Sequence, residues 1–274
     1  MSLPILYTKP VPSRANLVRL FHQTESQWSQ HLADEETLEI GTAFSNPQLS
    51  SVYDANNVRD VQLPPGMTPG AAVDLVGTYY TQRKTSCAYW TMNPSAPESA
   101  TRPMVEYLIS AGYRENAADI LLLTHTPKNR IAEAEGLKII PARASYRHTR
   151  ILAEESARNW GAPELAEAWM LHLDDPHWEA LLALKDGVPA AYIGVLTMGE
   201  VGRIDEVYVG QAFRGQGIGT TMLSRILEVC GRAMFKHVML SVLPGNAAGV
   251  RLYSKFGFET IGQITAYFAK GPWH

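Results

Sequence analysis

The feature that most constrains this chain is a glycine-bearing bend between a predicted strand and a predicted helix. An apolar run ends in Val207-Tyr208-Val209, and after a short loop comes the segment Arg214-Gly215-Gln216-Gly217-Ile218-Gly219-Thr220. The helix expected next has an apolar stripe formed by Met222, Leu223, Ile226, Leu227 and Cys230. Glycines at such a junction let backbone N–H groups face outward, and the helix N-terminus adds partial positive charge. The bend is therefore suited to bind a phosphate, with the Arg214 guanidinium placed to support the same anion.

Three other interpretations of this bend compete with that one. A P-loop needs Gly-Lys-Ser/Thr, but the chain has Gly219-Thr220-Thr221 with no lysine. A dinucleotide fingerprint needs a third glycine where Thr220 stands, and an acidic residue about twenty positions on, where the chain has none. A glycine turn used only for packing is the default for a single G-x-G. The strand, the arginine and the helix in register favour an anion site instead.

The segment closely resembles the cofactor signature of the GCN5-related N-acetyltransferase (GNAT) family, Gln/Arg-x-x-Gly-x-Gly/Ala, which Arg214, Gly217 and Gly219 match. Further on, the family has an asparagine, a tyrosine seven residues later and a Gly-Phe pair, which match Asn246, Tyr253 and Gly257-Phe258. The resemblance covers residues 137–269, about half of the chain. It implies a GNAT fold, an α/β (α+β) arrangement with a mixed, mostly antiparallel central sheet flanked by helices.

The resemblance also implies acetyl-CoA as cosubstrate, with no metal. The loop amides of residues 214–220 would bind its pyrophosphate, and the strand with Val207, Tyr208 and Val209 would splay from its neighbour and pair with the pantetheine. Asn246 would add a cofactor contact, although an asparagine there is as readily a helix N-cap. The site residues expected to bind the cofactor are Val207, Tyr208, Val209, Arg214, Gly215, Gln216, Gly217, Ile218, Gly219, Thr220 and Asn246.

The chemistry of acetyl transfer gives Tyr253 and two carboxylates catalytic roles. An alkyl amine has a pKa of ~10.4, so its deprotonation at pH 7 costs about 4.6 kcal/mol unless the site helps. Tyr253 is expected to hydrogen-bond the departing thiolate, although a tyrosine between Leu252 and Phe256 could equally belong to the core. The general base is expected to be Asp205 or Glu206, which face opposite sides of a regular strand; a bulge would remove that distinction. The choice between them stays open.

The first half of the chain is interpreted as a degenerate copy of the second. Cys87–Met92, the helix through Leu108 and the strand Ile120–Leu123 follow the order of Val238–Leu243, the Tyr253 helix and the last strand. No Arg-x-x-Gly-x-Gly occurs before this first set, so the copy is expected to lack a cofactor site. The predicted domains are residues 1–128, without a cofactor loop, and 129–274, the catalytic domain, joined by a polar linker at Thr124–Glu135. Aromatic residues of the first half could line the acceptor groove: Tyr79, Tyr80, Tyr89 and Trp90.

The function expected from these features is transfer of an acetyl group from acetyl-CoA to a primary amine by direct attack. Cys230 in the apolar stripe and Cys87 in the half without a cofactor loop are poor nucleophiles. The alternatives are an idle acetyl-CoA-binding regulatory module, another acyl-CoA donor, or a non-amine acceptor. The expected partner is a small-molecule or peptide amine, and the chain is expected to act as a monomer or homodimer.

Charge and composition narrow the remaining partners and the location. A net charge of −3 argues against a general nucleic-acid or membrane-surface binder. Two cysteines and no apparent signal or membrane segment predict a cytoplasmic protein. His172, Asp174, Asp175 and His177 suggest a metal cluster, but their irregular spacing around Pro176 favours a surface loop. No metal site is predicted.

Overall fold

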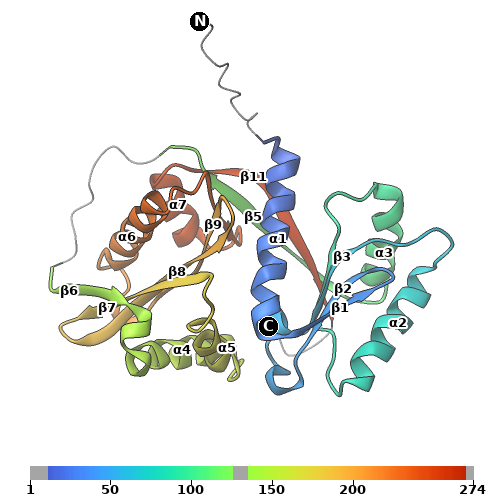
Figure 1. Cartoon of the computed structure of the whole chain (residues 1–274), viewed down its shortest axis with the longest axis horizontal. Coiled ribbons are helices and arrows are strands. Elements are labelled where there is room, and N and C mark those ends of the chain that lie inside the picture. The colour runs from blue at the N-terminus through green and yellow to red at the C-terminus, as the bar shows by residue number, and fades with distance from the viewer. Residues whose placement is uncertain (1–11, 126–134, 270–274) are drawn as a thin grey trace, which may run out of the picture.

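One continuous sheet runs through both halves of the chain (Figure 1). The computed structural model describes residues 12–125 and 135–269, and within them eleven strands pair in the order β1-β2-β3-β4-β11-β5-β10-β9-β8-β7-β6. Only β3 with β4 and β9 with β10 are parallel pairs among these strands. The predicted mixed, mostly antiparallel sheet is therefore confirmed.

The elements alternate along the chain much as the hydrophobic periodicity predicts. The strands are β1 Asp34–Leu38, β2 Gly41–Ser45, β3 Asn57–Val61, β4 Tyr89–Met92, β5 Arg114–Leu123, β6 Leu137–Pro141, β7 Trp178–Lys185, β8 Val188–Met198, β9 Val201–Val209, β10 His237–Val242 and β11 Phe258–Phe268. The α-helices are α1 Arg14–Leu32, α2 Pro69–Gln82, α3 Glu98–Ser110, α4 Tyr146–Trp160, α5 Leu165–His172, α6 Ile218–Arg232 and α7 Ala247–Lys255. Among the short 3-10 helices, η2 spans Tyr53–Ala55 and η4 spans Gln211–Phe213.

The series β3-α2-β4-α3-β5 of the first half recurs as β9-α6-β10-α7-β11 in the second. In each series the first two strands are parallel. The last strands are exchanged between the halves: β11 lies between β4 and β5, and β5 lies between β10 and β11. The order of elements matches the predicted repeat. The division at residues 128 and 129 stays a prediction, because residues 126–134 lie outside the described part of the chain.

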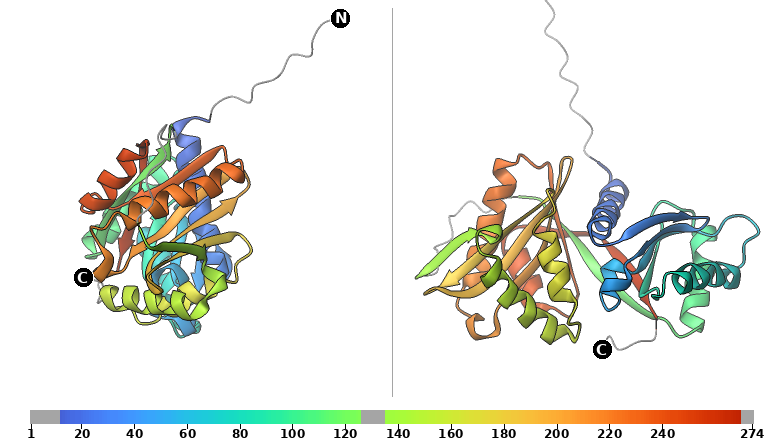
Figure 2. Two further views of the ribbon diagram at one scale, coloured as in Figure 1. Left: turned by 90° about the vertical axis from the view of Figure 1, so that its left-hand side faces the viewer. Right: turned by 60° about the horizontal axis from the view of Figure 1, so that its bottom comes forward.

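Helices cover both faces of the sheet, as the views in Figure 2 show. In the second half, alternate residues of β8 face opposite layers: Ile193 and Val195 pack with α6 and α7, whereas Tyr192 and Leu196 pack with α4 and α5. Helix α1 crosses the middle of the sheet, where Phe21 packs against residues of β5, β9 and β10. This helix therefore lies at the junction of the two halves (Figure 1).

Three boundaries differ from the sequence expectations. Strand β5 begins at Arg114 rather than near Ile120, because its polar first half pairs with β11 and carries no apolar pattern. The residue pattern predicts a helix start at Pro103, whereas α3 begins at Glu98 and continues through this proline. Gly231 predicts a C-terminal cap, whereas α6 continues past it to Arg232.

Candidate active site

The bend between β9 and α6 presents a series of unpaired backbone N–H groups. Gly215 and Gly217 have φ angles of 77° and 78°, in the left-handed region that favours glycine. A Cβ at either position would meet no other atom within 4 Å, so both face open space. None of the amides of residues 215–220 donates a hydrogen bond to another described residue, and the N-terminus of α6 has no side-chain cap. Unpaired amides at a helix N-terminus form a site for an anion.

The side chains of this bend support its shape. The Nε of Arg214 donates to the carbonyl oxygen of Val209 at 3.1 Å, and the Nε2 of Gln216 donates to that of Ala212 at 3.2 Å. A Cβ on Gly219 would lie 3.5 Å from Val209, an ordinary van der Waals contact, so α6 packs directly against β9 at this residue. Ile218 is buried in the core and has only its amide to offer a ligand.

Strand β9 separates from β10 beside this bend. Their parallel pairing joins Val201–Arg203 with His237–Met239 and stops there, while β10 continues against β5. Among the described strands, none pairs with Val207–Val209 on the β10 side. The splay expected from the family resemblance is therefore present. Tyr208 turns its side chain to α4, where its hydroxyl donates to Glu155 Oε1 at 2.9 Å.

Tyr253 and Asn246 lie on α7, beside the gap. Asn246 caps the helix, its side chain accepting a hydrogen bond from the Gly249 amide at 2.9 Å. Tyr253 is 6 % exposed and packs in the core near Phe258. Burial raises the pKa of Tyr253, and the carboxylate of Asp205 raises it further. The hydroxyl therefore remains protonated at neutral pH and can only act as a hydrogen-bond donor to an anion or a thiolate.

A bulge in β9 sets the positions of Asp205 and Glu206. The pairing with β8 shifts between Asp205 and Tyr208, so the alternation of faces fails at this point. Glu206 has a φ angle of 53°, uncommon for a residue with a side chain and typical of strain retained at functional sites. The Glu206 amide donates to Asp205 Oδ1 at 2.8 Å. The regular-strand expectation that the two carboxylates face opposite sides is thus removed by the bulge.

The pKa values of both carboxyl groups are raised. For Asp205 the first cause is burial, opposed by the Arg203 guanidinium 2.7 Å away and reinforced by the carboxylate of Glu25. For Glu206 burial acts first, followed by repulsion from Asp205 and from Asp54, and its pKa lies well above the usual range. Carboxyl groups whose pKa values are raised are suited to accept a proton from an amine.

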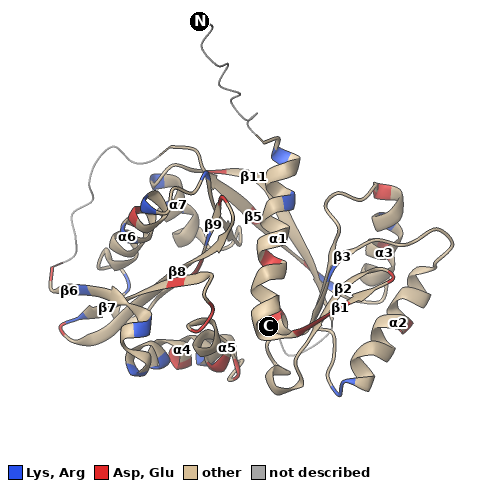
Figure 3. Ribbon diagram, viewed as in Figure 1, with Lys and Arg blue, Asp and Glu red and all other residues tan. Residues whose placement is uncertain are grey.

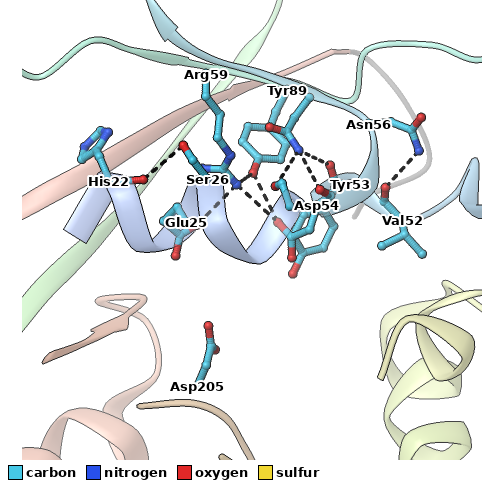
Figure 4. Close-up of polar contacts among 12 residues, drawn as sticks. His22, Glu25, Ser26, Val52, Tyr53, Asp54, Asn56, Arg59, Tyr89 and Asp205 are labelled. Carbon is cyan, nitrogen blue, oxygen red and sulfur yellow. Dashed lines mark hydrogen bonds and ion pairs between the residues drawn. The ribbon is translucent and has the colours of Figure 1, made fainter. Parts of the chain in front are cut away.

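Helix α1 and the first half add a charged network that the sequence analysis did not anticipate (Figure 4). Glu25 of α1 pairs with Arg203 of β9 and, at 3.4 Å, with Arg59 of β3. Arg59 also lies 3.7 Å from Asp54 and bonds the Tyr89 hydroxyl. The signal was present in the sequence, since Arg59 and Arg203 each interrupt an apolar strand pattern and such arginines are seldom buried unless paired.

The aromatic residues expected at the acceptor side divide into two groups. Tyr79, Tyr80 and Trp90 are buried in the core of the first half. Tyr89 is buried too, but its hydroxyl donates to Asp54 Oδ1 at 3.2 Å and so belongs to the charged network. Only Tyr89 among these four contacts this network.

The supposed surface loop at residues 172–177 is partly buried, which corrects the sequence interpretation. His172 stacks on Trp28 of α1 with ring centroids 3.4 Å apart, and Asp175 is buried beside it. No cluster of histidine, cysteine and acidic residues placed to hold a metal occurs in residues 12–125 and 135–269. Burial raises the pKa of Cys87 and of Cys230 to about 12, so neither thiol is a ready nucleophile.

Lysine and arginine residues are spread over both halves rather than gathered on one face (Figure 3). In the part of the chain that the structure describes, no helix has the length and apolar character needed to cross a bilayer.

Residues 146–258 match the acetyltransferase (GNAT) family. This stretch contains the bend, the splayed strand and α7. Residues 146–258 therefore form a GNAT-family domain. Among relatives, a Bacillus subtilis protein named as a ribosomal protein bS18-alanine N-acetyltransferase is 28 % identical over 96 residues, covering 35 % of this chain and 64 % of the relative. The L-methionine sulfoximine/L-methionine sulfone acetyltransferase of Pseudomonas aeruginosa is 39 % identical over 69 residues, covering 24 % of this chain and 40 % of its own length.

Solved GNAT structures share the fold over more of the chain. A GCN5-related N-acetyltransferase from Kribbella flavida has a TM-score of 0.64 at 14 % identity, covering 92 % of this chain and 96 % of that one. A tandem GNAT protein from the clavulanic acid biosynthesis pathway has a TM-score of 0.55 at 19 % identity, covering 79 % of this chain and 76 % of that one. The likeness to the Kribbella protein extends through the first half, outside the segment that matches the family.

Proposed function

We propose that this GNAT protein transfers an acetyl group from acetyl-CoA to a primary amine by direct attack of the amine on the thioester. The observation that carries the proposal is the run of unpaired amides at residues 215–220, beside a strand that has lost its partner. These amides fit a diphosphate, and the edge of Val207–Val209 fits the amide groups of a pantetheine arm. Acetyl-CoA supplies the activated acetyl group when bound.

In this proposal Tyr253 donates its hydroxyl hydrogen bond to the departing thiolate. Its raised pKa keeps the hydroxyl protonated, and its place on α7 sets it beside the gap between β9 and β10. Because a tyrosine is a weaker acid than a thiol, full proton transfer to sulfur is uphill by roughly 2 kcal/mol, and stabilisation by hydrogen bonding is the main contribution.

Asp205 is assigned as the group that accepts the amine proton. The Asp205 side chain is 40 % accessible, and its carboxylate raises the pKa of Tyr253, so it acts near the hydroxyl that would face the thiolate. Glu206 instead interacts with Asp54 and Trp169. In the Asp205→Asn variant we expect kcat to fall and its rise with pH to disappear. The Glu206→Gln variant should keep that rise, and the reverse pattern would exchange the two roles.

Calorimetry and a thiol-release assay test the function as a whole. CoA should bind the full chain, and free thiol should appear when acetyl-CoA and a primary amine are both present. Binding without thiol release for any amine would indicate the idle regulatory module instead. Faster release from another acyl-CoA, or with an alcohol acceptor, would indicate a different transferase. Absence of CoA binding would overturn the proposal.

A further inference from the structure

The two halves turn carboxylates toward one another beside the candidate active site. Figure 4 shows Asp205, on β9, pointing toward Glu25 and Asp54, on α1 and η2. Asp205 has 40 % of its side chain accessible, and Glu25 and Asp54 have 18 % and 17 %. The carboxylates of Asp54 and Asp205 repel Glu206 strongly enough to raise its pKa, so all three groups share one region. Solvent therefore reaches a space with acidic walls contributed by both halves.

The charges of this space do not balance. Four carboxyl groups (Glu25, Asp54, Asp205 and Glu206) face two guanidinium groups (Arg59 and Arg203), and both guanidiniums are already ion-paired. Burial and the lower pKa of about 4 keep His22 neutral beside them. Burial and then Glu25 raise the pKa of Asp54 to about 7. Among the described residues Glu206 has no ion-pair partner, and Asp54 shares Arg59 with Glu25. A bound cation would take the place of the protons that the raised pKa values of Asp54 and Glu206 retain.

Buried aromatic side chains lie beside these carboxyl groups. Trp169, only 2 % exposed, stacks on Tyr192 with ring centroids 4.8 Å apart and meets Tyr208 edge-on. Its indole N–H has no hydrogen-bond partner of normal geometry, yet it acts on the Glu206 carboxyl and lowers its pKa. Beside Asp54, Tyr53 packs against Tyr89 with ring centroids 6.1 Å apart. The buried Trp169 N–H therefore faces the Glu206 carboxyl group, and carboxylates beside aromatic rings are the groups that bind ammonium ions.

We propose that the acceptor is an amine with a second positive charge, and that Asp54 and Glu206 bind that second ammonium group while the reacting nitrogen faces Asp205. This inference rests on the proposed function and deepens it by assigning the acceptor class. It also gives the first half a role as one wall of the acceptor site. Asp54 is then a specificity-determining residue contributed by the half without a cofactor loop.

Three acceptors of equal length separate the possibilities: 1,4-diaminobutane, n-butylamine and 4-aminobutanoate, which differ only in the charge at the far end. We expect kcat/KM to fall at least tenfold from the diamine to butylamine, and further to the amino acid. In the Asp54→Asn variant the preference for the diamine over butylamine should fall to about one. The matched control Asp74→Asn, on the exposed face of α2, should keep the full preference.

Binding supplies a readout independent of turnover. With CoA present, 1,4-diaminobutane should bind the full chain in calorimetry with release of protons near pH 7, because the cation displaces them from Asp54 and its neighbours. The groups that face Asp54 in this titration are Glu25, Arg59, Tyr53, Tyr89, Arg203, Asp205 and Glu206.

The outcomes distinguish the inference from the function on which it rests. Equal kcat/KM for diamine and butylamine, or a preference unchanged in Asp54→Asn, would overturn the inference and leave acetyl transfer intact. Absence of thiol release with these three amines and with every other amine tested, while the diamine still binds through Asp54, would overturn the proposed function and uphold the cation site. Lack of diamine binding to the CoA-loaded protein would overturn the cation site by itself.

Discussion

The loops after β3 and β9 occupy equivalent places in the two repeated series, yet the backbone N–H groups at the start of the following helix differ in their hydrogen bonding. After β9, the amides of residues 215–220 are unpaired and the helix N-terminus is uncapped. After β3, Thr68 caps α2 by accepting a hydrogen bond from the Ala71 amide at 3.2 Å, and Pro69 removes one N–H at the first helical position. The first loop has therefore satisfied internally the groups that the second leaves for an anion.

The parallel strand pairs beside these two loops also differ, in how far their pairing extends. Pairing of β3 with β4 reaches Val61 and Met92, whereas pairing of β9 with β10 stops at Arg203 and Met239. Both first strands nonetheless keep a residue with positive φ, Asp60 at 55° and Glu206 at 53°. Both halves therefore share the order of strands and helices and a residue with positive φ in the first strand. Within the described residues, only the second half has the separated strands that could admit a cofactor.

The largest expected effect on activity concerns Tyr253 of α7. When the two halves are aligned, the equivalent residue in α3 is Leu108. Tyr253→Phe should lower kcat by about 10²–10⁴, because the thiolate loses its donor. CoA affinity should stay within about twofold. Tyr107→Phe, on the exposed face of α3, is the control and should change neither quantity. An unaltered kcat in the Tyr253 variant, measured by thiol release, would remove this residue from the mechanism.

Glu25 tests the charged network that joins the halves. Glu25→Gln leaves Arg59 and Arg203, which are 2 % and 1 % exposed, without their shared carboxylate. Loss of one partner from a buried pair costs ~3–5 kcal/mol of unfolding free energy, to be measured by urea denaturation. Glu167→Gln breaks the exposed pair with Arg150 and should cost less than about 1 kcal/mol. Equal costs for the two variants would show that the network does not stabilise the junction.

The two glycine bends provide a matched pair. Gly217→Val should weaken CoA binding about 10²-fold in calorimetry, because the added side chain enters the space before the unpaired amides and removes one or two charge-assisted hydrogen bonds. Gly66→Val places the same strain in the loop after β3, where φ is 86° and the space is equally open. CoA affinity should be unchanged there. A similar loss in both variants would mean that strain, rather than the site, is being measured.

The smallest effect is a dependence of stability on pH through Asp54. Its pKa is raised to about 7 in the folded protein from 3.8, so the folded state holds a proton that the unfolded state has lost between these values. Stability relative to Asp54→Asn should therefore fall as pH rises from 5 to 7, by at most about 1.4 kcal/mol per pH unit. Denaturation at several pH values measures this difference. A constant difference would place Asp54 outside the coupled carboxyl groups.

Much of the fold could be predicted because local patterns determine it. The glycine bend, the stripe of α6 and the Asn246 and Tyr253 spacing depend on residues close together in sequence. Periodicity likewise predicts helices over residues 13–31 and 247–255, and α1 and α7 occupy residues 14–32 and 247–255. The splay of β9 from β10 came from the family resemblance rather than from any pattern in the residues.

The rest depends on contacts between residues far apart in the chain. Nothing local places Glu25 against Arg203, which lie 178 residues apart, or inserts β11 between β4 and β5. The bulge at Glu206 follows from the pairing of β9 with β8, so the sequence could not decide between Asp205 and Glu206. Buried His172 was also missed, because its environment is supplied by Trp28, which lies 144 residues earlier in the chain.

Because β5 and β11 are exchanged between the halves, we expect neither half to fold without the other. A fragment containing only the second half would lack the strand between β10 and β11, leaving two unprotected edges prone to self-association. Melting is thus expected as one cooperative transition, and separately produced fragments should become soluble only when mixed. For protein engineers this means that grafting the catalytic portion alone into another scaffold will fail unless β5 travels with it.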